Sequence, residues 1–282
     1  MPVLRWAARG GGAHLPPRER LPALTVTGAF ETADLDVVGR ITPASNLAFL
    51  VRVAGAEAYA IYKPVSGERP LWDFPDGTLA ARERAAYLVS ETGGFGLVPE
   101  TVLRDGPLGL GSVQRWVGEP EEPLEEVVDI VLRARLRPGW VVGFEAEDLV
   151  GREVVVAHRD GPRMRSMAVL DAVLNNADRK GGHLALDADG RLWGFDHGLV
   201  CHAEPKLRTV LWGFAGDPLD PADVERLGRL RAALEGDLCD ALGPLLTAEE
   251  RVALTRRVDR ILASGVHPLP PRHRYGIPWP PV

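Results

Sequence analysis

The sequence predicts an α+β fold in which a strand-rich first lobe precedes a mainly helical second lobe. Between about residues 24 and 117, short apolar runs alternate with turn-forming residues, which is typical of a β-sheet. From residue 162 onward, apolar residues recur mostly at helical spacing. The acidic, proline-bearing stretch Glu119–Pro123 separates the two patterns. We therefore expect a flexible leader over residues 1–22, a first lobe over 23–118 and a second lobe over 119–282.

The first lobe is expected to contain short strands and one helix. Thr78 is a plausible N-cap for a helix over Thr78–Glu91, and Gly93 with Gly94 would end it. Glycines and prolines before residue 23 favour a loosely attached leader. The expected strands are Leu24–Gly28, Leu35–Ile41, Leu47–Val53, Tyr59–Tyr62, Thr101–Leu103 and Ser112–Val117.

The second lobe begins with a stretch, Leu124–His158, that we expect to be irregular. A hairpin is expected where Asp187–Gly190 forms a turn between two short apolar runs. The other expected elements are a helix at Pro162–Asn176, strands at His183–Leu186 and Leu192–Phe195, helices at Ala222–Leu242 and Ala248–Ser264, and an extended tail at Pro268–Val282.

Composition excludes several classes of protein. The 282 residues carry 33 Lys and Arg against 39 Asp and Glu, a formal net charge of −6, so the chain lacks the basic surplus that non-specific nucleic-acid binding uses. No apolar run approaches the roughly 18 residues of a membrane span, and no signal-peptide core is present. Two cysteines are too few for a disulfide framework. We expect a cytoplasmic protein with no nucleic-acid partner and no stable membrane association.

Lysine is scarce, which directs attention to the few that remain. The chain uses lysine only at Lys63, Lys180 and Lys206, and arginine supplies the other basic residues. Lys and Arg differ where a compact point charge is needed. Lys63 ends an apolar strand, and Glu83 lies on the apolar stripe of the following helix, where an unpaired carboxylate would be costly. We expect Lys63 to pair with Glu83; the alternative is that Glu83 lies at the edge of the stripe beside solvent-exposed arginines.

Polar residues also gather directly after the apolar helix that ends near residue 176. The segment Asn175–His183 contains two Asn, an Asp, an Arg, a Lys and a His, more than a helix C-cap needs. Asp196 follows the second strand of the next hairpin and is expected to lie near Asp178. Two carboxylates suit a hard divalent cation such as Mg²⁺ or Mn²⁺.

Together these residues match the requirements of phosphoryl transfer from a nucleotide. Lys63 would hold phosphates with Glu83 behind it, Asp178 would orient the acceptor and Asp196 would hold metal. The turn before the second apolar run, at Ser45 and Asn46, is a weak candidate for a phosphate loop because it lacks repeated glycines.

Two short motifs resemble type II phosphatidylinositol 4-kinases. The string Leu170–Arg179 resembles their catalytic segment, and Phe195–Leu199 resembles their metal-binding segment. Over roughly residues 35–280 the chain also looks like an uncharacterised actinobacterial family described as phosphatidylinositol 3-/4-kinase-like, through Lys63–Pro75, Asn175–His183 and Glu204–Trp212. HipA-like atypical kinases are more distant relatives.

The resemblance implies a two-lobed, protein-kinase-like fold with ATP and Mg²⁺ or Mn²⁺ between the lobes. The implied catalytic residues are Asp178, Arg179 and Lys180, and the implied metal ligands are Asp196 and His183. One departure matters, because His183 stands where those kinases have a metal-binding Asn, and imidazole suits softer ions. The implied nucleotide contacts are Lys63, Glu83, Ser45, Asn46 and, as a hinge that receives adenine, Gln114, Arg115, Trp116 and Val117.

Three alternatives stay open at this stage. A nucleotide-binding pseudokinase would explain His183 and the poor glycine loop. Adenylyl transfer would use the same residues as phosphoryl transfer. A metallohydrolase built from Asp178, His183, Asp196, His197 and His202 would leave Lys63 and Glu83 without a role. The expected acceptor is a small hydroxylated metabolite or a protein side chain. Trp72, Phe74 and Trp212 could line its part of the cleft or pack between the lobes. Contact of Lys206 or Arg208 with a substrate phosphate is a further hypothesis.

Overall fold

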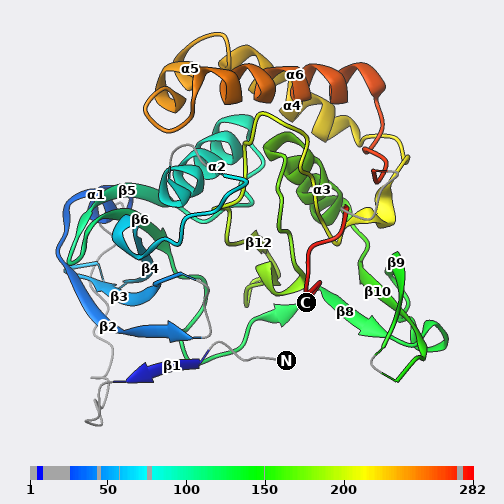
Figure 1. Cartoon of the computed structure of the whole chain (residues 1–282), viewed down its shortest axis with the longest axis horizontal. Coiled ribbons are helices and arrows are strands. Elements are labelled where there is room, and N and C mark those ends of the chain that lie inside the picture. The colour runs from blue at the N-terminus through cyan, green and yellow to red at the C-terminus, as the bar shows by residue number, and fades with distance from the viewer. Residues whose placement is uncertain are drawn as a thin grey trace.

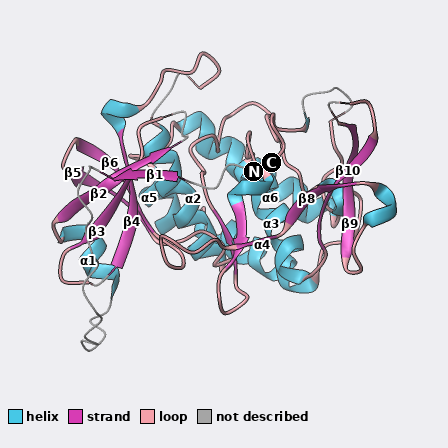
Figure 2. Cartoon of the chain, turned by 90° about the horizontal axis from the view of Figure 1, so that it is seen from below, coloured by secondary structure: helices cyan, strands magenta, loops and turns pink. Residues whose placement is uncertain are grey.

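The computed structural model describes residues 5–8, 26–42, 46–56, 58–74, 78–148, 150–271 and 276–282. Within them the chain has an α+β architecture with three antiparallel sheets, as the sequence predicts (Figure 1). Figure 2 shows the largest sheet and the sheet of β8, β9 and β10 at opposite ends of the molecule, with most helices between them. No helix among the described residues is long and apolar enough to cross a membrane.

The largest sheet has six strands in the order β1-β2-β3-β4-β6-β5, and every neighbouring pair is antiparallel. Most expected strands of the first lobe are present in it. One is wrong, because Leu24–Gly28 overlaps the helix α1 (Val26–Thr32), which packs Phe30 into the core beneath the sheet. The strands are β1 (Arg5–Ala8), β2 (Leu35–Thr42), β3 (Phe49–Val53), β4 (Ala58–Pro64), β5 (Thr101–Gly106) and β6 (Gly109–Arg115).

The expected leader is only partly outside the sheet. Within residues 1–22 the structure describes Arg5–Ala8, which form β1 and pair with β2 in antiparallel register, Arg5 opposite Thr42. The prediction that the whole leader is loosely attached is therefore wrong for residues 5–8, which belong to the sheet. The remaining residues of the leader lie outside the described part of the chain.

Strand β4 presents two different faces. Side chains alternate along a strand, so Ala60 and Tyr62 share one face and Ile61 and Lys63 the other. Ala60 and Tyr62 are fully buried in the core that contains α1. Ile61 packs beside Trp116 in a second, smaller apolar cluster. Lys63 therefore ends the strand on the face that carries this smaller cluster.

Helix α2 (Leu79–Gly93) follows; Thr78 caps it as predicted, and it runs two residues past the predicted end at Glu91. Thr78 Oγ1 accepts a hydrogen bond from the Ala81 N–H at 3.1 Å, and the left-handed Gly94 (φ 77°) ends the helix. Its apolar side lies in the largest core of the molecule, together with α3 (Pro162–Leu174). Because α2 packs against both the sheet and the helical part, it fixes the position of Glu83 relative to both.

The helices of the second part cover α2 and α3. In Figure 1, α4 (Pro221–Ala233), α5 (Asp237–Leu242) and α6 (Ala248–Ser264) lie along the top of the molecule. Helix α6 has the predicted bounds and a complete capping box at Thr247 and Glu250. The expected single helix Ala222–Leu242 is wrong, because the chain leaves helical geometry around Gly236 and forms two helices.

Two three-stranded sheets complete the fold. Their orders are β8-β10-β9 and β12-β11-β7. The stretch Leu124–His158 is therefore not irregular, because four strands lie between residues 125 and 159. The run from Val154 to Ala157 is buried throughout, because β10 is the central strand of its sheet. The strands are β7 (Glu125–Glu126), β8 (Val128–Val131), β9 (Trp140–Glu147), β10 (Glu153–Arg159), β11 (Leu184–Leu186) and β12 (Leu192–Gly194), and short 3₁₀ turns lie at Val65–Gly67, Arg133–Arg135, Gly181–His183 and Trp212–Phe214.

Candidate active site

The loop of residues 175–183 connects α3 to β11 and is shaped by its two asparagines. Asn175 adopts the left-handed conformation (φ 52°) that Asn tolerates well, and its Nδ2 donates to the Glu204 carbonyl at 2.7 Å. Its Oδ1 accepts from the Lys206 N–H at 2.8 Å. Asn176 Oδ1 accepts from the Asp178 N–H at 3.0 Å. Both asparagines therefore hold the backbone of the loop.

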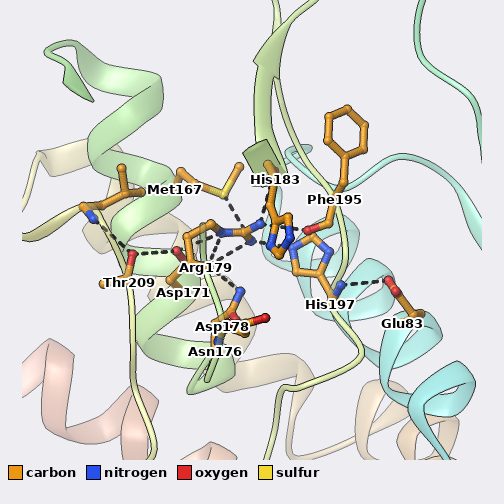
Figure 3. Close-up of polar contacts among 11 residues, drawn as sticks. Glu83, Met167, Asp171, Asn176, Asp178, Arg179, His183, Phe195, His197 and Thr209 are labelled. Carbon is orange, nitrogen blue, oxygen red and sulfur yellow. Dashed lines mark hydrogen bonds and ion pairs between the residues drawn. The ribbon is translucent and has the colours of Figure 1, made fainter. Parts of the chain in front are cut away.

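Arg179 lies beneath this loop and is not exposed (0%). Its guanidinium pairs with Asp171 of α3 at 2.9 Å, donates to the Phe195 carbonyl at 2.9 Å and reaches His197 Nε2 at 2.7 Å (Figure 3). Asp171 also accepts from Thr209 Oγ1 at 3.2 Å. The expectation that Arg179 is catalytic is therefore corrected: its donors are directed into the interior, and it positions the loop and the segment after β12.

Asp178 and Lys180 lie on the other side of the loop. The Lys180 ammonium is 3.0 Å from Asp178 Oδ2, and the side chain of Asp178 is 26% exposed. Burial raises the pKa of the Asp178 carboxyl, although Lys180 opposes that shift. Both side chains are accessible from the surface of the site.

Lys63 joins the two parts of the molecule at this site. Its Nζ is 2.5 Å from Glu83 Oε1 on α2 and 2.8 Å from Asp196 Oδ1 after β12. The other oxygen of Glu83 accepts from the His197 N–H at 3.0 Å. The predicted Lys63–Glu83 pair is thus present, and the alternative of a solvent-exposed Glu83 is wrong because its side chain is buried. Burial alone would lower the pKa of Lys63, but Asp196 and Glu83 raise it above its ordinary value.

Asp196 and His183 are the predicted metal ligands, and the structure places them next to each other. His183 Nε2 is 3.5 Å from Asp196 Oδ2, and the backbone of Asp196 is left-handed (φ 54°). Lys63 holds the pKa of the Asp196 carboxyl well below its ordinary value. Burial lowers the pKa of His183 to about 4, so the imidazole is neutral at pH 7.

This pair fits a metal only together with other oxygen ligands. Mg²⁺ is often bound through one or two carboxylates plus substrate phosphates and water. Asp196 is 54% exposed, and its Oδ2 is 3.5 Å from the neutral imidazole of His183. Among the described residues no group of three or more His, Cys, Asp or Glu could hold a metal ion. The donor set therefore suits a metal shared with phosphates.

The described histidines are not assembled into a separate metal site. His197 is fully buried, with its Nε2 bound to Arg179. His202 lies edge-on to Phe74, with ring centroids 5.2 Å apart. The metallohydrolase alternative consequently finds no support in the described residues.

The predicted hinge residues serve mainly the sheet. Gln114 is buried and donates to Thr101 Oγ1 at 2.8 Å, and Arg115 pairs with Glu100 at 2.6 Å. The Trp116 N–H donates to the Tyr59 carbonyl at 2.9 Å. The side chains of Gln114 and Arg115 are thus directed to neighbours within the first lobe.

Trp116 has a second property that suits a ligand site. Its indole packs against the small apolar cluster with Ile61 and Val38, on the face that carries Lys63. The indole Nε1 is buried and has no hydrogen-bond partner among the described residues. Val117 is buried next to it.

The predicted phosphate loop is described by the structure only in part. Ser45 falls outside the described residues. Asn46 Oδ1 accepts from the Arg69 N–H at 2.9 Å, so this side chain holds the loop after β4. The contacts of Asn46 therefore do not support a role as a direct phosphate ligand.

Three partners of the site were not singled out from the sequence as site residues: Asp171, Arg82 and Glu250. Arg82 is buried, pairs with Glu250 of α6 at 2.5 Å and donates to the Val200 carbonyl at 2.7 Å. This pair ties α2 to the second part directly beside Glu83. A charged residue among apolar neighbours on a helix is a signal that identified Glu83 from the sequence. The same signal could have identified Asp171 and Arg82.

Two kinases are among the solved structures that match this chain at low similarity. The crystal structure of the golgi casein kinase matches with a TM-score of 0.49 and 12% identity, covering 85% of this chain and 73% of that one. The Helicobacter pylori proinflammatory kinase CtkA matches with a TM-score of 0.44 and 11% identity, covering 84% of this chain and 94% of that one. Both TM-scores are below 0.5, too low to establish a common fold.

The sequence itself has a much more similar relative. No protein-family model matches the chain. Protein Rv2133c of Mycobacterium tuberculosis (strain ATCC 25618 / H37Rv) is 48% identical over 256 residues, which span 88% of this chain and 92% of that protein. An actinobacterial relative is what the sequence resemblance leads us to expect, whereas the likeness to phosphatidylinositol kinases stays a prediction. The chain belongs to the family of the mycobacterial protein Rv2133c.

Proposed function

We propose that this protein is an ATP-dependent phosphotransferase with a two-lobed, kinase-like architecture. One observation carries the proposal: Lys63 from the sheet meets Glu83 from α2 and Asp196 from the helical part, at 2.5 and 2.8 Å. A strand lysine held by a helix glutamate, beside an aspartate, is the arrangement that kinases use around the phosphates of ATP. Such a site would bind the nucleotide between the sheet and the helical part, with the apolar cluster at Trp116 and Ile61 facing the base.

Each residue then has a defined task. Lys63 carries a full positive charge and would neutralise phosphate oxygens, while Glu83 fixes its ammonium group. Asp196 and His183 would hold Mg²⁺ or Mn²⁺. When bound, such a metal neutralises negative charge on the phosphates. Binding of phosphates would compete with Asp196 for Lys63, since the ammonium contacts that carboxylate directly.

Asp178 would act on the acceptor. The acceptor hydroxyl oxygen forms a bond to the γ-phosphorus, the bond from that phosphorus to the β–γ bridging oxygen breaks, and ADP leaves. The hydroxyl proton passes to the carboxylate of Asp178. A raised pKa makes this carboxylate a better proton acceptor, and Lys180 at 3.0 Å keeps it ionised before transfer.

A nucleotide-binding protein without turnover is the second candidate, and His183 favours it. A neutral imidazole is a poorer ligand for Mg²⁺ than a carboxamide or carboxylate oxygen. Weak metal binding would leave a nucleotide bound mainly through Lys63. Adenylyl transfer would use the same residues with a different phosphorus as the target.

Calorimetric titration of ATP tests the proposal, with Mg²⁺, with Mn²⁺ and with chelator. We expect binding that depends on metal and is lost in Asp196→Asn, a substitution that keeps the left-handed backbone accessible. The matched control is Asp189→Asn, at an exposed turn position. Equal binding with and without metal would favour the second candidate, and absence of binding under all three conditions would refute both.

A further inference from the structure

The segment of residues 206–210 runs directly beside the loop that carries Asp178. The Arg208 N–H donates to the Asn176 carbonyl at 2.8 Å, and the Arg208 carbonyl accepts from the Arg179 N–H at 3.0 Å. The backbone of Arg208 is therefore bonded on both sides of Asp178. This places the guanidinium close enough to Asp178 to oppose the rise of its pKa.

Two cations on this segment share one carboxylate. Lys206 Nζ is 3.7 Å and Arg208 Nη2 is 3.6 Å from the same oxygen of Asp73, which lies in the loop after β4. Both distances exceed those of a good charge-assisted hydrogen bond. Within the described part of the chain, neither cationic side chain donates a hydrogen bond. Asp73 thus balances their charge only in part.

These cations are partly withdrawn from water. The side chains of Lys206 and Arg208 are 17% and 33% exposed, and the Lys206 ammonium lies 5.6 Å from the centre of the Phe74 ring. Partly desolvated cations with unused donors favour binding of an anion. Together with Lys180 and Asp178, the ion pairs of this cluster among the described residues comprise three cations and two carboxylates.

The position of the lysines supports a specific role. Of the three lysines in the sequence, Lys63 and Lys180 contact Asp196 and Asp178, and Lys206 lies in the neighbouring segment. All three therefore belong to one region, in a chain whose other basic residues are arginines. A point charge at Lys206 is consistent with contact to a small anion.

We propose that Lys206 and Arg208 bind an anionic group, a phosphate or carboxylate, of a small acceptor whose hydroxyl lies at Asp178. This inference rests on the proposed phosphotransferase function and adds the chemical class of its acceptor. The recessed position of both cations favours a compact organic anion over an extended polymer. Asp73 occupies the place of the anion in the free protein and competes with it.

Binding of inorganic phosphate tests the site without knowledge of the acceptor. Titration calorimetry at constant ionic strength would compare the unmodified protein with four variants: K206Q/R208Q, D73N, K63M and, as an exposed control cation, R135Q. We expect K206Q/R208Q to weaken phosphate binding at least about tenfold and D73N to tighten it about fivefold, because a competing charge at about 4 Å is removed. R135Q should leave the dissociation constant unchanged, whereas K63M should remove only phosphate that binds at Lys63 and leave binding at Lys206 and Arg208.

The tightening in D73N separates a binding site from a structural ion pair, since loss of a purely structural contact would not improve phosphate binding. Phosphate binding that survives in K206Q/R208Q, weakens in D73N, or is absent from the unmodified protein at tens of millimolar would overturn the proposal. Competition against phosphate tests the class: glycerol 3-phosphate should displace it and glycerol should not, and displacement by an acidic serine peptide alone would refute a small acceptor.

The same variants distinguish this inference from the proposed function. K206Q/R208Q should bind ATP with metal as the unmodified protein does, because neither residue contacts Lys63 or Asp196. A protein that binds phosphate at Lys206 and Arg208 but no ATP would refute the phosphotransferase and leave the anion site standing. A protein that binds ATP with metal but no phosphate at Lys206 and Arg208 would refute the anion site alone.

Discussion

The two sides of the loop at residues 175–183 differ in what their charges do. On the inner side, Arg179 and Asp171 are fully buried, and the donors of the guanidinium have protein partners. On the outer side, Asp178 and Lys180 are partly exposed and contact mainly each other. Adjacent residues in the sequence thus face opposite environments, and only the outer pair can contact a substrate.

This difference in burial separates the side chains that position the loop from the side chains that can react with a substrate. A buried ion pair with every donor satisfied resists rearrangement and fixes the backbone above it. A carboxylate with a raised pKa at the surface of a site is suited to exchanging a proton. Similar residue types therefore predict opposite mutational phenotypes on the two sides of the loop.

The largest expected effect is on the outer side, in Asp178→Asn. If Asp178 accepts the hydroxyl proton, the rate of ADP release from ATP should fall by about 10²–10⁴-fold. The free energy of unfolding should stay the same or rise at pH 7, because burial disfavours the ionised carboxylate that the variant removes. Steady-state kinetics and urea unfolding on the same sample measure both. An unchanged rate would remove Asp178 from the chemistry.

The inner side should give the opposite result in Asp171→Asn. Arg179 would keep its charge in the interior without its counter-ion, so the free energy of unfolding should fall by about 3–5 kcal/mol. The exposed variant Asp189→Asn is the control and should change that energy by less than about 0.5 kcal/mol. Thr209→Val removes one hydrogen bond to the same carboxylate and should give a smaller loss, which keeps the test open if Asp171→Asn does not fold. Full stability in both variants would contradict a positioning role for the buried pair.

Sequence reasoning found the ion pair between Lys63 and Glu83 more readily than the buried pair on the inner side of the loop. Lys63 and Glu83 could be paired in advance because a carboxylate on an apolar helix stripe needs a cation, and lysines are scarce. Asp171 lies among apolar residues of α3 in the same way, yet its partner Arg179 follows only eight residues later in a polar loop. That Arg179 turns inward depends on the carbonyl of Phe195 and the imidazole of His197, which tertiary folding brings there.

The fold was predictable where local signals determine it. Helix α6 has an N-cap, a capping box and a left-handed glycine at its end, and both of its bounds were predicted. Strands β7 and β8 were missed because their pairing is not local: Glu126 of β7 lies opposite Ala185 of β11, and Val131 of β8 lies opposite Val155 of β10. Propensity alone does not reveal a strand whose partners lie more than twenty residues away. Strand β9 was missed although it pairs with β10 in a local hairpin, with Glu147 opposite Glu153.

A partly buried histidine, His183, and a fully buried one, His158, extend the comparison from ion pairs to the pH dependence of stability. Burial lowers the pKa of both His183 and His158 to about 4. His183 Nδ1 has no hydrogen-bond partner among the described residues and lies beside the reactive groups. His158 lies on β10 and has both ring nitrogens bonded: Nδ1 contacts the Arg159 carbonyl at 2.9 Å, and Nε2 accepts from the Gly213 N–H at 3.2 Å. These partners fix the neutral form with its proton on Nδ1. We therefore expect His158 to contribute to the stability of the fold rather than to the reaction.

The smallest predicted effect follows from that assignment. Because the pKa of His158 is lower in the folded protein than its ordinary value of 6.5, the unfolded chain binds more protons between these pKa values. The contribution of the neutral ring to stability is therefore full above pH 6.5 and is lost as the pH falls toward 4. Between pH 7 and pH 5 the free energy of unfolding should fall by about 2 kcal/mol more in the unmodified protein than in His158→Gln. Urea unfolding at the two pH values measures this difference, and parallel losses in both proteins would show that protonation of His158 does not limit stability.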